Sequence, residues 1–135
     1  MASEETEGNT LLLNDAERRD LRERTKEYAL GIIQLNALLQ KDTVLQVLGR
    51  QLLRSGTSVG AKYREAFRSR SSAEFVAKIG DCLKELEETA YWLELLHDGT
   101  NQANDKIDHL LDDTDQLLAF FTSIVKKVKS QFSAQ

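Results

Sequence analysis

Proline is absent from the 135-residue chain, and cysteine and tryptophan occur once each. Without proline, no helix needs to end or bend at a missing backbone amide, so helical segments can be long. The lone cysteine excludes an internal disulfide and suits a reducing compartment. Cys82 shares a helical face with Phe75, Ile79 and Leu86, where a small buried thiol is common. We therefore expect Cys82 to be a core residue and not a nucleophile.

Long apolar runs are also missing. No run approaches the roughly 20 residues that a transmembrane helix requires. The start of the chain, MASEETEGNT, is acidic and polar, whereas a secretory signal is basic and then apolar. We therefore expect a cytoplasmic protein that does not enter a membrane. A chain of this length suits one domain, which would bury about two-thirds of its unfolded surface.

The sequence patterns of common enzyme sites do not occur either: there is no phosphate loop, dinucleotide-binding pattern or catalytic triad. Glu94 and His97 match the Glu-x-x-His pair of di-iron bundles, but such a site needs a second pair and two further glutamates. The other histidine, His109, has Lys106 at the matching position. We expect no enzyme activity, no catalytic residue, no metal, no cofactor and no small-molecule substrate. A metal enzyme acting through Glu94 and His97 is an alternative that elemental analysis would test.

Apolar residues recur at helical spacing in four segments, and turn-like residues gather between them. The expected helices cover about 15–40, 43–67, 72–97 and 104–130, within a domain of residues 14–132. Residues 1–13 are expected to be disordered or loosely attached. Because short connections favour antiparallel neighbours, the sequence predicts an all-α, single-domain, up-down-up-down antiparallel four-helix bundle.

Local signals mark where the third helical segment begins and ends. Ser71 and Glu74 have the spacing of a capping box, in which the hydroxyl and the carboxylate each accept a hydrogen bond from a backbone amide. Gly99 follows the segment, and we expect it to adopt the left-handed conformation that commonly ends a helix.

Two glycines, Gly56 and Gly60, interrupt the second helical segment. Each interior glycine costs roughly 0.5–1 kcal/mol relative to alanine, so glycines four residues apart need a compensating contact. Close approach of another backbone is the simplest one. Gly49 and Leu53 extend the same stripe by one turn each, so we expect close packing, or a contact between copies, along this face.

The first and third helical segments carry apolar residues outside their core stripes. These residues are Leu30 and Ile33 in the first segment and Tyr91, Trp92 and Leu95 in the third. A helix that is apolar on two faces is normally enclosed on both, and Tyr and Trp are common interface anchors. We therefore expect these residues to lie in an interface between copies. The alternative is that Leu11–Leu13 cover them within one chain.

The net charge of −4 is unevenly distributed. Residues 50–70 carry six basic side chains and one acidic one, whereas residues 81–115 carry eleven acidic and two basic ones. The basic side chains are Arg50, Arg54, Lys62, Arg64, Arg68 and Arg70. Such a stripe suits phosphate backbones, but arginine also pairs well with carboxylates. Because the overall charge repels nucleic acid, we favour ion pairs with residues 81–115.

Three stretches carry a family resemblance: QLLRSGTSVGAKYREA at 51–66, SSAEF at 71–75 and CLKELEETAYWLELL at 82–96. Over roughly residues 25–127 the chain resembles the bacterial four-helix-bundle proteins, also called 23S ribosomal RNA intervening-sequence proteins. That family includes accessory proteins of diversity-generating retroelements. The resemblance implies a homopentamer of bundles arranged as a barrel. For the retroelement relatives it also implies binding of nucleic acid and of a reverse transcriptase through a basic surface.

The residues and the resemblance together favour a non-enzymatic homo-oligomer, expected to be a pentamer, that acts as a scaffold or accessory for a macromolecular partner. The alternative is a nucleic-acid-binding accessory protein, such as a reverse-transcriptase partner, that acts through the basic stripe of the second helix.

Overall fold

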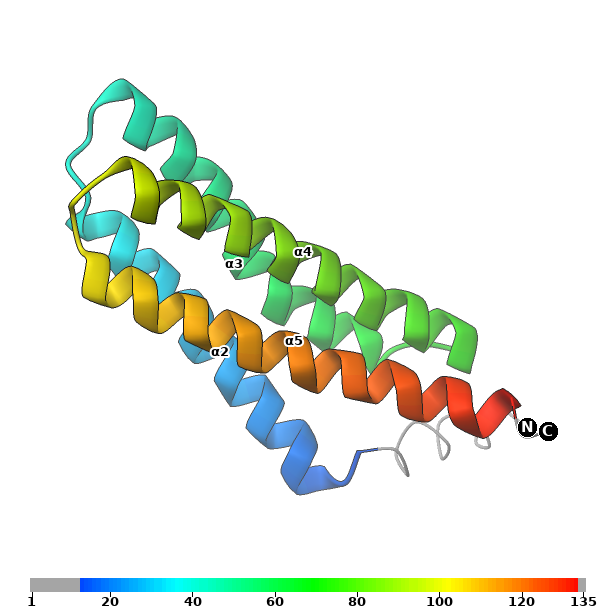
Figure 1. The fold of residues 1–135 in the computed structure, drawn as a ribbon. Coiled ribbons are helices and arrows are strands. Elements are labelled where there is room, and N and C mark those ends of the chain that lie inside the picture. Colours follow the sequence, from blue (N-terminus) through cyan, green and yellow to red (C-terminus); the bar gives the residue numbers. More distant parts are fainter. Residues whose placement is uncertain (1–12, 134–135) are drawn as a thin grey trace.

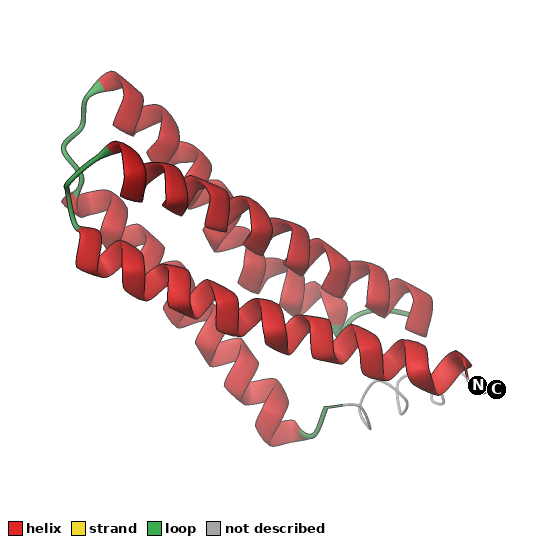
Figure 2. Ribbon diagram, in the orientation of Figure 1, coloured by secondary structure: helices red, strands yellow, loops and turns green. Residues whose placement is uncertain are grey.

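The computed structural model describes residues 13–133, which form four α-helices and no β-strand (Figures 1 and 2). The helices are α2 (Asp15–Leu38), α3 (Thr43–Ala66), α4 (Ser72–Gly99) and α5 (Asn104–Ser133). They pack against one another as one domain, so the expected all-α four-helix fold is confirmed. No helix in residues 13–133 combines the length and the apolar character needed to cross a membrane.

Polar contacts show that neighbouring helices run antiparallel (Figure 1). Between α2 and α5, the Tyr28 hydroxyl is hydrogen-bonded to the Thr114 hydroxyl. Lys106, near the start of α5, donates a hydrogen bond to Gln34, near the end of α2. Between α3 and α4, Thr89 donates a hydrogen bond to Ser55. Nearer the end of α3, Glu65 accepts a hydrogen bond from Lys78, which lies near the start of α4. Each helix packs on two neighbours, which leaves α2 diagonally opposite α4. α2 packs more closely on α3 than on α5.

The core is a continuous set of apolar side chains from all four helices. At one end, the rings of Tyr63, Phe67, Phe75 and Phe121 lie in mutual contact, with neighbouring centroids 5.0–5.7 Å apart. Cys82 is completely buried, and burial raises the pKa of its thiol to about 12. The thiol is therefore not available as a nucleophile at neutral pH.

A layer of buried hydroxyl groups crosses the middle of the core, with one residue from each helix. The Tyr28 and Thr114 oxygens lie 2.6 Å apart, and the Ser55 and Thr89 oxygens lie 2.8 Å apart. All four side chains are buried, and burial raises the pKa of the Tyr28 hydroxyl. Because each buried hydroxyl has a partner, the layer favours one alignment of the helices over shifted ones.

The glycines of α3 face α2 inside the same chain. Gly56 lies against Ile32, where an added Cβ would come within 2.8 Å of Cγ1. Gly60 lies against Thr25, where a Cβ would stand 3.2 Å from Oγ1, and the Asn36 side chain fills the space beside Gly49. Leu53, in the same stripe, is half-buried against the core. The glycine stripe therefore lets α2 and α3 approach closely.

The helix starts differ in part from the expected caps. Ser71 caps α4 by accepting a hydrogen bond from the Glu74 amide at 3.1 Å. The Glu74 carboxylate, however, accepts from the amide of Arg70 and not from Ser71, so the expected reciprocal box is half formed. A complete capping box occurs instead at the start of α2, between Asn14 and Glu17.

The expectation for Gly99 was wrong. α4 continues through Gly99, no glycine in residues 13–133 has a positive φ, and Thr100 ends the helix in an extended conformation. The Thr100 amide donates to the Leu96 carbonyl, which satisfies the last turn without a left-handed residue. The left-handed residue of this connection is Ala103, with φ of 53°.

Candidate functional site

Large apolar side chains remain exposed on all four helices of the completed bundle. Leu30 and Ile33 of α2 are 46% and 47% exposed, and Tyr91 of α4 is 54% exposed. Leu38, Val44, Val47 and Phe120 are exposed as well. Leu13 is buried in the core, whereas Leu11 and Leu12 lie outside the described residues. Within residues 13–133, nothing in the chain covers Leu30, Ile33 or Tyr91. We call Leu30 and Ile33 the α2 patch.

The exposed Tyr91 belongs to a larger surface on α4. Its ring lies 5.3 Å from that of Trp92 at an angle of 56°. Trp92 is half-buried against the core, and its indole nitrogen donates to Glu88 at 3.3 Å. Leu95, one turn after Tyr91, is also half-buried. We call Tyr91, Trp92 and Leu95 the α4 patch.

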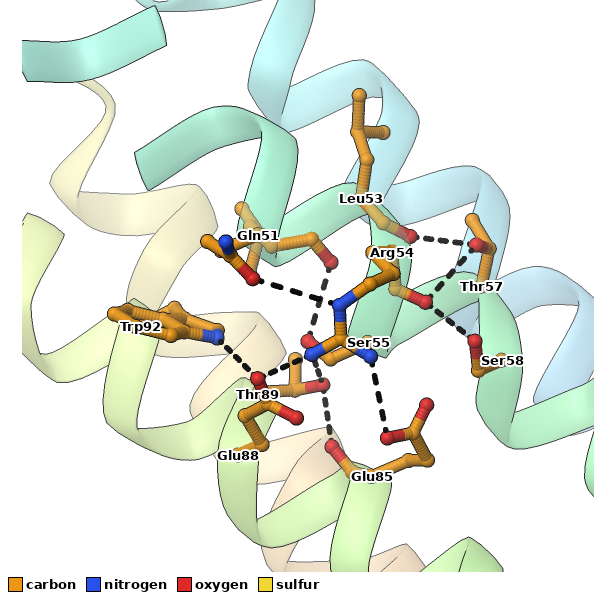
Figure 3. Close-up of polar contacts among 11 residues, drawn as sticks. Gln51, Leu53, Arg54, Ser55, Thr57, Ser58, Glu85, Glu88, Thr89 and Trp92 are labelled. Atoms are coloured by element: carbon orange, nitrogen blue, oxygen red, sulfur yellow. Dashed lines mark hydrogen bonds and ion pairs between the residues drawn. The ribbon is translucent and has the colours of Figure 1, made fainter. Parts of the chain in front are cut away.

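An ion-pair network fixes the edge of this patch to α3 (Figure 3). The Arg54 guanidinium donates to Glu88 and lies 3.5 Å from Glu85. The hydrogen bond from Arg54 holds the pKa of the Glu88 carboxyl below its usual range. Because Glu88 also accepts from Trp92, the network orients the indole ring. Arg54 therefore pairs within its own chain.

The remaining basic residues of α3 divide into two groups. Lys62 lies 3.9 Å from Glu65, which also pairs with Lys78 of α4 at 3.4 Å. The other group has no ion pair with an acidic side chain of residues 13–133; its members are Arg50, Arg64, Arg68 and Arg70. The stripe therefore contains both paired and available guanidinium groups.

Two of the available arginines line a groove of about 650 Å³ between α2 and α3. Its lining residues are Asp15, Arg18, Arg19, Arg22, Tyr63, Arg64, Phe67 and Arg68. The Arg18 guanidinium lies over the Phe67 ring, 4.3 Å from its centroid, and the Tyr63 hydroxyl donates to the Arg18 carbonyl at 3.0 Å. Five arginines against one aspartate make this arginine groove strongly positive.

Three arginines of the groove, Arg18, Arg19 and Arg22, were not predicted from the sequence. Residues 15–27 of α2 carry five acidic and five basic side chains, so a charge count gives no signal there. The helical spacing of the three arginines places them near one another on α2. Only the pairing of α2 with the end of α3 shows that they face Arg64 and Arg68.

Glu94 and His97, the residues considered for a metal site, lie three residues apart on α4. His97 Nδ1 lies 3.0 Å from Asp98, and Nε2 lies 3.2 Å from Asp108 of α5. The hydrogen bond with Asp98 raises the pKa of His97. Glu94 is exposed. In the described part of the chain, no three His, Cys, Asp or Glu side chains gather in a way that could hold a metal ion.

The two helical hairpins carry opposite charge. Residues 13–70, with α2 and α3, hold 12 basic and 7 acidic side chains, a net charge of +5. Residues 71–133, with α4 and α5, hold 6 basic and 12 acidic side chains, a net charge of −6. The α2 patch thus lies on the basic hairpin and the α4 patch on the acidic one.

Comparison with known proteins supports the resemblance. The 23S rRNA-intervening sequence protein family matches residues 17–123, which include all or most of every helix. The chain belongs to this family. A solved crystal structure from Bacteroides thetaiotaomicron VPI-5482 is 35% identical, with a TM-score of 0.72. The comparison covers 78% of this chain and 97% of that one, a protein of unknown function from the S23 ribosomal protein family. No curated protein matches the chain.

The match to the 23S rRNA-intervening sequence protein family includes both apolar patches and most of the arginine groove. The description of the Bacteroides relative states no activity. The surfaces of this family member are therefore the main guide to its function.

Proposed function

We propose that this family member is a non-enzymatic scaffold whose copies associate, with a homopentamer as the expected form, and which binds a macromolecular partner. The observation that supports self-association is the exposure of Leu30, Ile33 and Tyr91 on a bundle whose core is already complete. Single exposed apolar residues are common on monomers, but these belong to two patches on long helices. Residue types at the α4 patch, Tyr and Trp, are those that anchor interfaces most often.

Burial of the two patches alone would stabilise an assembly only modestly, so a stable interface would extend beyond them. Covering the exposed half of one large apolar side chain contributes roughly 1 kcal/mol, from about 25 cal/mol per Å². A stable interface usually buries at least about 1,200 Å² in total. Other exposed apolar side chains of α2 and α3, Leu38, Val44 and Val47, are available to enlarge such an interface.

Light scattering coupled to size exclusion tests this function. Wild-type protein at micromolar concentration should show a molar mass several times the 15.3 kDa of one chain, near five times for the pentamer. Replacing Leu30 and Ile33 together by Asp should reduce the mass, because carboxylates cannot be buried unpaired. Ala61→Asp, at an exposed position on α3 outside both patches, is the matched control and should leave the mass unchanged. Equal masses for all three proteins would contradict the role of the α2 patch.

A second candidate function, nucleic-acid binding, is favoured by the arginine groove. Its five guanidinium groups can neutralise phosphates, and counterion release then gives affinity that falls steeply with salt. Tyr63 is buried and Arg18 covers the Phe67 ring, so neither aromatic residue is free to stack on a base. Binding in this groove would therefore depend on the phosphate backbone and not on base sequence.

Fluorescence anisotropy with labelled RNA and DNA tests the second candidate. Replacing Arg19 and Arg64 by Glu should weaken binding and reduce its dependence on salt. The matched control replaces Lys41 and Lys84, which lie outside the groove, by Glu and changes the net charge equally. Absence of salt-dependent binding at low ionic strength, or equal loss in both variants, would contradict binding at the groove.

A further inference from the structure

The arginine groove holds more positive charge than its own acidic residue neutralises. Asp15 is the one acidic side chain in its lining, and it lies 4.0 Å from Arg18. The other four guanidinium groups are exposed and form no ion pair with an acidic side chain of residues 13–133; they belong to Arg19, Arg22, Arg64 and Arg68. Because like charges gathered along one groove repel each other, the groove favours an anionic occupant.

The first twelve residues of the chain carry charge of the opposite sign. Residues 1–12, which we call the acidic segment, read MASEETEGNTLL and contain no lysine or arginine. Their three acidic side chains are Glu4, Glu5 and Glu7, a charge of −3. The four groove arginines without an ion pair among the described residues carry +4. The acidic segment and the groove are therefore nearly matched in charge.

The acidic segment joins the bundle beside the groove. It is followed by Leu13, which is buried in the core, and Asp15 of the groove comes two residues later. An extended chain spans up to about 3.5 Å per residue, so Glu7 can lie as far as about 20 Å from Leu13. The groove residues of α2, from Asp15 to Arg22, cover only about 10 Å of helix. The glutamates can therefore reach the guanidinium groups on both helices of the groove.

Attachment to the same chain favours this occupant over a free anion. A short tether holds a ligand at an effective concentration in the millimolar range, whatever the concentration of the protein. Each ion pair with an exposed guanidinium group contributes little alone. Several such pairs, formed together by a tethered segment, are enough to keep the groove occupied in most molecules.

We propose that the acidic segment docks in the arginine groove of its own chain, with Glu4, Glu5 and Glu7 against the exposed guanidinium groups. Docking goes beyond the proposed function, because it requires neither another copy nor nucleic acid. It has one consequence that rests on the second candidate function: a phosphate ligand has to displace the segment. The apparent dissociation constant of that ligand is then the intrinsic one divided by the fraction of molecules whose groove is free.

Zero-length cross-linking tests the identity of the occupant. Arg64→Lys keeps the charge of the groove and supplies a primary amine, which a carbodiimide joins to a neighbouring carboxylate. Mass spectrometry should find this amine linked to a glutamate of the acidic segment, in a product that keeps the 15.3 kDa mass of one chain on denaturing electrophoresis. The matched control, Arg50→Lys, supplies an amine at an exposed position of α3 outside the groove and should not give this product.

The reactivity of the native arginines gives a second readout. Phenylglyoxal modifies accessible guanidinium groups, and peptide mass spectrometry reports the rate at Arg64 and at Arg68. A variant in which glutamine replaces all three glutamates of the acidic segment should react faster at both positions. If the segment fills the groove in two of three molecules, the rates should rise about threefold.

A charge-matched variant controls for the change in net charge. It neutralises three exposed acidic side chains outside the groove, through Glu87→Gln, Glu94→Gln and Asp115→Asn. Its rates at Arg64 and Arg68 should equal those of wild type. The rate at Arg50, outside the groove, should be the same in all three proteins.

Either of two results would overturn the inference. A missing cross-link, or one that joins two chains, would show that the acidic segment does not fill the groove of its own chain. Equal phenylglyoxal rates at Arg64 and Arg68 in wild type and in the glutamine variant would show that the glutamates do not cover these arginines. Neither assay contains nucleic acid, so these failures are distinct from failure of the second candidate function, which the anisotropy measurement reports.

Discussion

At the scale of single residues, the contact between Gly56 and Ile32 decides how closely α2 and α3 can pack. Ile32 is completely buried and branched at Cβ, so it cannot move aside for an added methyl group. Gly80, in the middle of α4, is the opposite case: nothing lies within 4 Å of the position its Cβ would take. The same residue type therefore has a packing role at one position and only a conformational cost at the other.

Replacing these glycines by alanine should have effects of opposite sign. Gly56→Ala should lower the free energy of unfolding by about 1–3 kcal/mol, because the Cβ would overlap Ile32. Gly80→Ala should raise it by about 0.5–1 kcal/mol through better helix propensity. Urea denaturation of the two variants and wild type measures both changes. Equal changes in the free energy of unfolding would mean that Gly56 does not lie on the face of α3 that packs closely on α2.

The Arg54 network gives a second prediction at this scale. Its side chains are partly exposed, so the pairing of Arg54 with Glu88 should contribute only about 0.2–1 kcal/mol to stability. A double-mutant cycle with Arg54→Ala and Glu88→Ala measures this coupling energy. A coupling above about 2 kcal/mol would show that the network is far better shielded from water than its exposure indicates.

At the scale of helices, apolar periodicity and the absence of proline were enough to predict four long helices. The buried hydroxyl layer has no comparable sequence signal, because Ser55, Thr89 and Thr114 are residue types that are common on helix surfaces. Their burial depends on which helices pair. The left-handed Ala103 was also unpredictable, since alanine has no preference for that conformation.

The contact between His97 of α4 and Asp108 of α5 should make the stability of the bundle depend on pH. Asp98 and Asp108 favour its charged form, so the pKa of His97 is higher in the folded protein than the ordinary value of about 6.5. A raised folded-state pKa contributes stability below that ordinary value, and the contribution is lost as pH rises through the folded-state pKa. Wild type should therefore exceed His97→Gln in melting temperature at pH 5.5–6, and the difference should shrink by pH 8. A difference that grows toward pH 8 would contradict this sign.

The cap of α2 provides another prediction at this scale. Asn14 accepts from the Glu17 amide at 2.8 Å, and the Glu17 carboxylate completes the box. Asn14→Ala should lower the free energy of unfolding by about 1 kcal/mol, because a backbone donor at the helix start loses its partner. Thermal denaturation checks this, with exposed Ala16→Gly as a control for propensity alone. An unchanged free energy of unfolding in the Asn14→Ala variant would mean that water satisfies the amides at the start of α2 equally well.

At the scale of the whole molecule, the exposed patches were predictable because a second apolar face leaves a periodic signal in the sequence. The arginine groove was not, because it exists only where the first half of α2 meets the end of α3. The charge division was partly visible: the sequence shows a basic and an acidic segment, but only the bundle places the two patches on hairpins of opposite charge. The pairing of the helices thus places the α2 patch on a basic surface and the α4 patch on an acidic one.

The molar mass of unmodified protein in solution tests most directly whether copies cover each other's apolar surface. Light scattering at near-physiological salt, over a hundredfold range of concentration, should give a mass several times 15.3 kDa that falls only on strong dilution. A mass of one chain at every concentration would contradict the account.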